Sequence, residues 1–218
     1  LLPSLSKANF EGNTEEYSSL LDWGLRLTFL LALPCAVGLA TISEPLTATL
    51  FHYGKFNELS VEMTSRALVA YGVGLIGLIL VKILAPGFYA QQNIKTPVKI
   101  AIGVLIATQL MNLVFVPWIA HAGLALSIGL GACLNAGFLY WGLKRRGIYT
   151  ALPGWRPFFI RLAGALFLMA AVALWTAGQF DWVALRATPF MRVIALLIVI
   201  AACGISYFGA LLAMGFRF

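Results

Sequence analysis

ALVAYGVGLIGLILVKILAPGFY, residues 67–89, is a run of 23 residues in which Lys82 is the single charged side chain. At a rise of about 1.5 Å per residue, a helix of this length crosses the roughly 30 Å hydrocarbon core of a bilayer. The run therefore predicts a transmembrane helix, and the same criterion finds further spans on both sides of it. The six predicted spans are residues 20–42, 67–89, 100–119, 122–143, 157–177 and 193–214.

The composition of the whole chain agrees with a polytopic membrane protein of the all-α class. Hydrophobic residues make up 61% of the chain, charged residues make up 11%, and the mean hydropathy is +0.91. Soluble domains are about half apolar and a quarter charged. The net charge of +7 does not indicate a nucleic-acid-binding protein, because the basic residues lie mostly in short connections between apolar runs. The chain starts at Leu1 with an apolar stretch that reads as the end of a helix, so we expect a fragment.

Basic residues in the short loops predict the orientation, since such loops are enriched in Lys and Arg on the cytoplasmic side. Two loops contain basic residues and no acid, and we expect both to be cytoplasmic: Lys95 and Lys99 in one, and Lys144, Arg145, Arg146 and Arg156 in the other. The opposite loops mix both signs, with Lys55 and Arg66 beside Glu58 and Glu62, and Arg186 beside Asp181. Both ends of the chain are therefore predicted to face the cytoplasm.

Acidic residues are absent from residues 63–180. A metal-dependent enzyme acting on phosphorylated lipids needs clustered carboxylates or histidines, and the two histidines, His52 and His121, are isolated in predicted outer loops. The three cysteines stand far apart in apolar runs without the CxxC spacing of a zinc or redox site. We expect no catalytic residue, no metal site and no cofactor.

Two charged residues inside spans are candidates for contact with an anionic substrate. Lys82 lies deep in its span, where a lysine costs about 2.5–3.5 kcal/mol on insertion scales, so it either faces a cavity or extends toward the cytoplasmic interface. Arg26 follows Asp22 by four residues and shares its helical face. This arrangement is typical of a self-neutralising pair, and the alternative is that Arg26 faces a water-filled cavity and holds a headgroup.

Polar and small residues form stripes on the third and fourth predicted spans. Thr108 and Asn112 share a face with Gln109 beside them, and a second polar stripe is formed by Ser127, Gly131 and Asn135. Small residues at this spacing are typical of close helix packing, which we predict for the parallel stripe through Gly129 and Cys133. The polar stripes are candidates for lining a hydrophilic substrate cavity.

The fifth and sixth predicted spans contain few polar groups. The simplest interpretation is a peripheral pair of helices that faces lipid. The alternative is a groove for lipid tails beside the transport core, whose candidate residues are Arg161, Cys203, Ser206 and Tyr207.

Several motifs together resemble the MurJ (MviN) family of bacterial lipid II flippases. They are Leu2-Pro3-Ser4-Leu5-Ser6, Asp22-Trp23-Gly24-Leu25-Arg26, Tyr53-Gly54-Lys55-Phe56, Ala85-Pro86-Gly87-Phe88-Tyr89, Lys95-Thr96-Pro97-Val98-Lys99 and His121-Ala122-Gly123-Leu124. The resemblance covers essentially the whole chain. It implies the C-terminal part of a fold of fourteen helices in two lobes around a cavity, with our six spans as helices nine to fourteen.

On that basis we expect four regions: 1–19 as the end of a preceding span and a cytoplasmic connection, 20–143 as four helices of the C-terminal transport lobe, 144–156 as a basic cytoplasmic loop, and 157–218 as two extra helices. The resemblance implies an inner-membrane transporter that moves an undecaprenyl-pyrophosphate-linked peptidoglycan precursor by alternating access, with the rest of the protein and membrane lipids as its other partners. The alternative is a related multidrug or O-antigen exporter. Some family members are thought to use an acidic residue for a sodium site, and Asn112 stands at that position here, which disfavours such a site.

Overall fold

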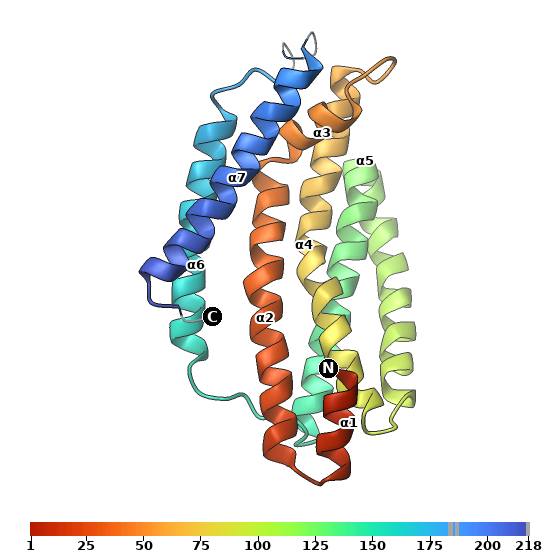
Figure 1. Ribbon diagram of the computed structural model, residues 1–218. Coiled ribbons are helices and arrows are strands. Elements are labelled where there is room, and N and C mark those ends of the chain that lie inside the picture. Colours follow the sequence, from red (N-terminus) through yellow and green to blue (C-terminus); the bar gives the residue numbers. More distant parts are fainter. Residues whose placement is uncertain (183–184, 186–187, 217–218) are drawn as a thin grey trace. The chain divides into compact units, whose positions relative to one another are not determined.

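Seven α-helices form the part of the chain that the computed structural model describes, residues 1–182, 185 and 188–216. Figure 1 shows them as α1 (Leu2–Phe10), α2 (Thr14–Thr41), α3 (Ser43–Phe51), α4 (Glu58–Tyr89), α5 (Lys95–Arg145), α6 (Trp155–Ala177) and α7 (Pro189–Ala213). The predicted all-α class is confirmed. Arg186, which we placed in an outer loop, lies outside the described residues.

Five of these helices are long and apolar enough to cross a membrane: α2, α4, α5, α6 and α7. The longest, α5, contains two of the predicted spans, because its backbone leaves the helical region at Ile119 (φ −129°, ψ 17°) and Ala120 (φ 45°, ψ −123°). The chain reverses direction there, and α5 forms a tight hairpin of two helical arms (Figure 1). We call the residues before Ile119 its first arm and the residues after Ala120 its second arm.

The spanning helices begin before their predicted spans, and the difference is largest for α2 and α4. α2 begins at Thr14 rather than at residue 20, and α4 begins at Glu58 rather than at residue 67. Both extra segments are amphipathic or polar, and a hydropathy criterion detects only the apolar part of a helix. Asn13 and Glu16 cap the start of α2: the Asn13 Oδ1 accepts a hydrogen bond of 3.0 Å from the Glu16 backbone N–H, and the Asn13 Nδ2 donates one of 3.1 Å to the Glu16 carboxylate.

The short helix α3 was not predicted. The first predicted span ends at residue 42, and the structure ends α2 at Thr41 and begins α3 directly afterwards at Ser43. The signal was present in the sequence, because Glu44 and Pro45 are residue types that favour the first turn of a helix. A helix of nine residues is too short to be recognised by a criterion based on spanning length.

The described chain divides into two compact units. Unit 1 consists of residues 1–33 and 73–154, and unit 2 consists of residues 34–72 and 155–218. The division cuts α2 at Pro34 and α4 after Gly72, two residue types that weaken a helix. Unit 1 therefore contains α1, the first part of α2, the last part of α4 and all of α5, and unit 2 contains α3, α6, α7 and the remaining parts of α2 and α4.

Each unit has its own apolar core. Leucines and one phenylalanine fill unit 1, including Leu21, Leu84, Phe88, Leu139 and Leu143. In unit 2, α6 and α7 pack along each other (Figure 1), and the contact buries one stripe from each helix, including Leu162, Ala165 and Met169 on α6 and Leu196, Val199 and Leu211 on α7.

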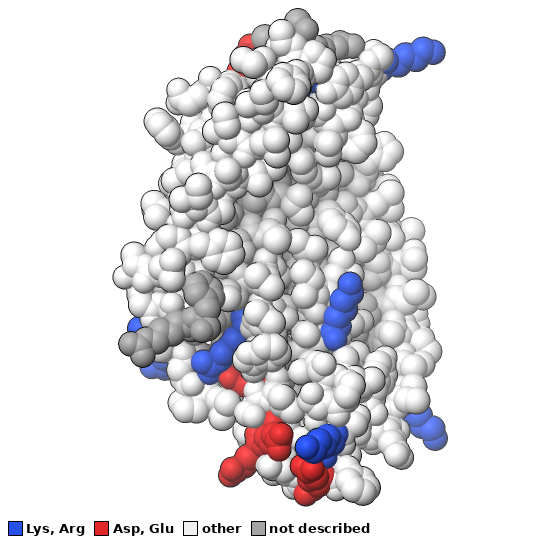
Figure 2. All heavy atoms as spheres, viewed as in Figure 1, with Lys and Arg blue, Asp and Glu red and all other residues white. Residues whose placement is uncertain are grey.

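Apolar side chains also cover much of the surface. On the face shown in Figure 2, uncharged residues occupy nearly all of the area, and charged side chains occur in a few small groups. Large side chains such as Leu113, Ile160 and Ile205 are more than 70% exposed. Surfaces of this kind are stable against lipid rather than water, which agrees with a multi-pass membrane protein.

Candidate functional site

All predicted substrate-cavity residues belong to unit 1. Arg26 lies on α2, Lys82 on α4, and Thr108, Gln109, Asn112, Ser127 and Asn135 lie on the two arms of α5. The packing of these three helices therefore decides which of the candidates are accessible.

Arg26 is engaged in contacts within the unit. Its Nε donates a hydrogen bond of 2.7 Å to the Asp22 Oδ2, and its terminal nitrogen donates one of 2.9 Å to the Pro153 carbonyl. The predicted self-neutralising pair with Asp22 is confirmed. A role for Arg26 in a substrate cavity stays a prediction.

The Asp22 carboxylate has further partners that the sequence did not reveal. The Tyr149 hydroxyl donates a hydrogen bond of 2.7 Å to Oδ1, and the Leu152 backbone N–H donates one of 3.3 Å to the same oxygen. Asp22 and Tyr149 are each only 1% exposed. Burial, the hydrogen bond to Asp22 and the negative charge of that carboxylate all raise the pKa of the Tyr149 hydroxyl, so Tyr149 keeps its proton and acts as the donor.

One turn earlier on the same face of α2, Ser18 binds the same linker. The Thr150 backbone N–H donates a hydrogen bond of 3.0 Å to the Ser18 Oγ, which in turn donates one of 2.8 Å to the Thr150 carbonyl. Ser18, Asp22 and Arg26 therefore hold the linker between α5 and α6. We call this set of contacts with residues 149–153 the linker clasp.

The polar stripes of α5 face each other across the hairpin. A Cβ placed on Gly131 would lie 2.2 Å from the Thr108 Oγ1, so the two arms are in close contact there. Thr108 and Ser127 direct their hydroxyls to the carbonyls of Val104 and Gly123 in their own helix, at 2.8 Å each. Packing between the arms therefore accounts for Thr108 and for Ser127, which is fully buried.

The three amide side chains of α5 are less completely bonded. Gln109 is exposed and its Oε1 accepts a long hydrogen bond of 3.5 Å from the Asn112 Nδ2. The Oδ1 atoms of Asn112 and Asn135 are buried and have no hydrogen-bond partner among the described residues. Buried amide oxygens normally accept hydrogen bonds, so these two atoms are suited to receive a donor from outside the described chain.

Among the substrate-cavity candidates, Lys82 is the one whose charged group is most clearly available to bind a ligand. Its side chain is exposed, and within the described residues it forms no hydrogen bond or ion pair.

The glycines of α4 pack against the second arm of α5: a Cβ on Gly74 would lie 2.1 Å from the Gly129 Cα, and one on Gly77 would lie 2.4 Å from the Cys133 nitrogen. The predicted close packing of the Gly129 and Cys133 stripe is therefore confirmed.

The predicted lipid-tail residues belong to unit 2 and lie differently. Arg161 is exposed on α6, while Cys203 and Tyr207 are buried on α7. The Ser206 Oγ donates a hydrogen bond of 3.0 Å to the Cys203 carbonyl of its own helix. A groove for lipid tails at these residues stays a prediction.

Unit 2 also contains a buried arginine whose contacts were not predicted. Arg192 is 0% exposed in the first turn of α7. It donates a hydrogen bond of 2.8 Å to the Ala48 carbonyl on α3, contacts the His52 Nδ1 at 3.5 Å and donates to the Trp182 carbonyl. Arg192 thereby fixes α3 and residue Trp182 to the start of α7.

Comparison with known proteins identifies the family. A family model described as "Lipid II flippase MurJ" matches residues 1–207. The chain belongs to the lipid II flippase MurJ family. A curated lipid II flippase MurJ from Burkholderia cenocepacia is 58% identical over 218 residues, covering 100% of this chain and 42% of the relative. A probable lipid II flippase MurJ from Vibrio cholerae is 34% identical over 222 residues, covering 100% of this chain and 41% of the relative.

A solved MurJ structure supports the fold. The chain of a lipid II flippase MurJ in an inward closed conformation superposes with a TM-score of 0.72, over 93% of this chain and 40% of that chain. The identity of 22% limits this comparison to the fold. This chain spans about two fifths of the length of the MurJ proteins that it matches.

Proposed function

We propose that this chain is part of a lipid II flippase, in which it supplies one side of the path for an undecaprenyl-pyrophosphate-linked peptidoglycan precursor. The observation that carries the proposal is the 58% identity with the Burkholderia cenocepacia lipid II flippase MurJ along the entire chain. The remainder of the transporter would supply the rest of the path, and movement between the two leaflets would follow alternating access. No catalytic step is part of this mechanism.

Lys82 is the residue of this chain that we propose to contact the anionic headgroup. It is exposed, it lies in the long apolar helix α4, and residues 63–180 contain no acid that could neutralise it. A lysine inside a span is stable where water or an anion offsets the cost of removing its charge from water. A pyrophosphate would provide that anion.

The membrane potential supplies a driving force for this transport. We propose that the chain sits in the bacterial inner membrane with both its ends in the cytoplasm. An inside-negative potential favours outward movement of an anion by about 2.3 kcal/mol per charge per 100 mV, so a doubly charged pyrophosphate gains roughly 5 kcal/mol. The proposal therefore needs no ionisable carboxylate in the spans of this chain as a coupling group.

The experiment is a comparison of two Lys82 variants in the whole protein that contains this chain. We expect Lys82→Arg to retain most of the lipid II flipping, and Lys82→Met, which keeps the apolar stem, to lower the rate by about tenfold. Flipping is measured as accessibility of labelled lipid II at the outer leaflet of proteoliposomes. Lys55→Met, on the exposed connection between α3 and α4, is the matched control and should have no effect. Undiminished flipping by Lys82→Met would show that this lysine does not contact the headgroup.

A further inference from the structure

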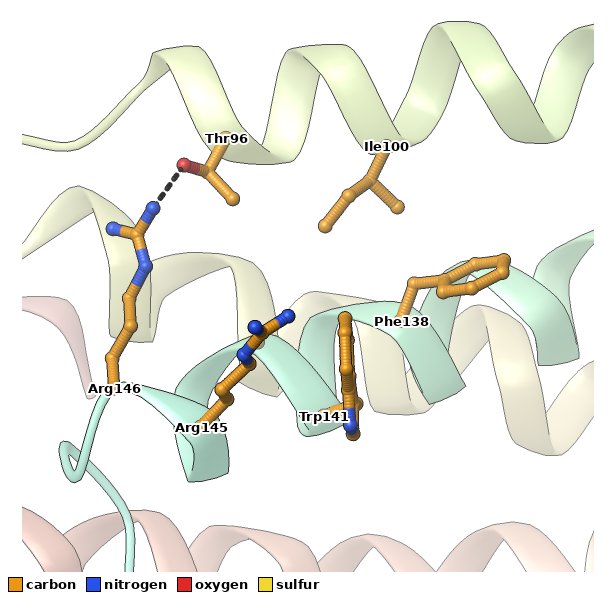
Figure 3. A pocket seen from close by; sticks show the side chains of 7 residues that line it. Thr96, Ile100, Phe138, Trp141, Arg145 and Arg146 are labelled. Atoms are coloured by element: carbon orange, nitrogen blue, oxygen red, sulfur yellow. Dashed lines mark hydrogen bonds between the residues drawn. The ribbon is translucent and has the colours of Figure 1, made fainter.

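A pocket of about 470 Å³ opens between the two arms of α5, close to both ends of the hairpin. Figure 3 shows Thr96 and Ile100 on the first arm facing Phe138, Trp141 and Arg145 on the second arm, with Arg146 at the end of the helix. None of these residues was a candidate for the substrate cavity. All of them belong to unit 1.

Two guanidinium groups are held at this pocket by different contacts. The Arg146 terminal nitrogen donates a hydrogen bond of 2.9 Å to the Thr96 Oγ1, and its Cζ lies 5.7 Å from the centre of the Phe88 ring. The Arg145 Cζ lies 5.1 Å from the centre of the Trp141 ring, and Figure 3 shows the two side chains next to each other. These contacts restrict the rotamers of both arginines and leave most of their N–H donors available.

The charge of the pocket is not neutralised by the part of the chain that the structure describes. Neither arginine forms an ion pair with a described carboxylate. Acids are absent from residues 63–180, and Lys95, Lys99 and Lys144 add positive charge at the same helix ends. Positive charge in a loop is sufficient to orient a helix in the membrane. Orientation does not require two arginines with restricted rotamers beside a tryptophan, so it does not explain this arrangement.

An apolar groove continues from the pocket along the second arm. A second cavity of about 500 Å³ shares Phe138 and Trp141 with the first and extends past Gly137 and Leu134 to Leu130. From Trp141 to Leu130 the helix rises by roughly 16 Å. Inorganic phosphate bound at the arginines would not contact this groove, whereas the acyl chain of a lipid could occupy it.

We propose that the pocket and the groove together bind one anionic phospholipid of the surrounding membrane. Arg145 and Arg146 hold its phosphate, since guanidinium groups bind phosphate oxygens through charge-assisted hydrogen bonds. Trp141 lies at the level of the glycerol backbone, the position that tryptophan prefers in a bilayer. One acyl chain occupies the groove from Phe138 to Leu130. Basic pockets between transmembrane helices on the cytoplasmic side are suited to anionic headgroups.

The first experiment measures lipid bound to the whole purified protein that contains this chain, by native mass spectrometry with phosphatidylglycerol or phosphatidylcholine added. We expect phosphatidylglycerol to bind more tightly than phosphatidylcholine. Replacing both arginines, Arg145→Ala with Arg146→Ala, should weaken phosphatidylglycerol binding by about tenfold or more and abolish the preference. The control is Lys144→Ala, which removes one neighbouring positive charge that does not line the pocket and should keep the preference.

A second variant tests the groove separately. A Cβ on Gly137 meets nothing within 4 Å, so Gly137→Leu is expected to fold normally while filling the groove. It should lower phosphatidylglycerol binding although every charge is retained. The thermal unfolding midpoint of each variant in detergent verifies that it is folded.

Three outcomes would overturn the proposal. Equal binding of the two phospholipids would show that the arginines do not select a charged headgroup. Displacement of phosphatidylglycerol by millimolar inorganic phosphate, together with unchanged binding by Gly137→Leu, would indicate a site for free phosphate. Displacement by lipid II at equal concentration would assign the site to the transported lipid rather than to a membrane phospholipid.

Discussion

The carboxylate of Asp22 connects residues that are far apart in the sequence. It accepts hydrogen bonds from Arg26 in its own helix and from Tyr149 and Leu152 in the linker that precedes α6. A buried charge is stable only when it is paired and hydrogen-bonded, and these three donors meet that requirement. The linker clasp therefore fixes residues 149–153 to α2.

Removing the Tyr149 hydroxyl should loosen this linker. We expect Tyr149→Phe to destabilise the protein by about 1–2 kcal/mol, because a buried carboxylate oxygen loses its shortest linker hydrogen bond. The control is Tyr140→Phe. The Tyr140 ring lies 5.6 Å from the Tyr149 ring, but its hydroxyl has no hydrogen-bond partner among the described residues.

Two measurements distinguish loosening of the linker from a general loss of stability. One is the thermal unfolding midpoint of the whole protein in detergent, and the other is the rate at which a cysteine at the exposed position Ala151 reacts with a thiol reagent. Tyr149→Phe should lower the first and raise the second. An unchanged labelling rate would mean that the clasp does not hold the linker.

One part of this cluster is predictable from the amino-acid sequence, and the other part is not. The pair of Asp22 and Arg26 was predictable, because residues four apart on a helix are neighbours. Tyr149 lies 127 residues from Asp22 along the chain, and neither periodicity nor charge indicates that they meet. The contact between Arg192 and His52, 140 residues apart, was missed for the same reason.

The packing of α4 on the second arm of α5 depends on glycine at the points of contact. Without side chains at Gly74 and Gly129, the two backbones approach more closely than any other residue would allow. Helices in lipid gain most of their mutual attraction from such close contact, because apolar side chains are as well solvated by lipid as by each other.

Gly74→Ala should therefore destabilise the protein, by about 1–3 kcal/mol, since its Cβ would lie 2.1 Å from the Gly129 Cα and one helix would have to move. Gly103→Ala provides the control, because a Cβ there meets nothing within 4 Å. It should leave stability unchanged or raise it by up to about 1 kcal/mol through its higher helix propensity. Thermal unfolding of both variants in the same detergent gives the comparison. Equal midpoints would show that α4 and α5 do not depend on this contact.

At the level of elements, hydropathy predicted each long helix and missed the short helix α3. Residues 67–89 and the other predicted spans are apolar over a length that matches the thickness of a bilayer, and this length and composition are typical of a transmembrane helix. The helix α3 is stabilised instead by local hydrogen bonds and by its contact with α7, and a contact between distant elements is not encoded in a local pattern.

The charges of the loops predict how the whole molecule is oriented in the membrane. In a cysteine-free background of the whole protein, cysteines at Ile94 and Ala151 should resist an impermeant thiol reagent in intact cells, because both lie beside basic, acid-free segments. A cysteine at Lys55 should react. Ala151 is a better position than Gly154, whose backbone has φ +99°, a conformation that a cysteine rarely adopts.

Permeabilised cells provide the reference for this experiment. All three cysteines should react once the membrane is opened, which shows that the protected positions were accessible in principle. Labelling of Ile94→Cys and Ala151→Cys from outside, with protection of Lys55→Cys, would reverse the proposed orientation.

The turn of α5 at Ile119 and Ala120 also bears on how the chain enters the membrane during synthesis. The turn offers no hydrophilic loop that could be translocated by itself, and His121 is its single ionisable side chain. A lone first arm would expose Thr108 and Asn112 to lipid, whereas the second arm covers the Thr108 side of that face. The two arms are therefore expected to leave the insertion machinery together as one helical hairpin. The basic residues at its two ends would be retained on the cytoplasmic side of the membrane.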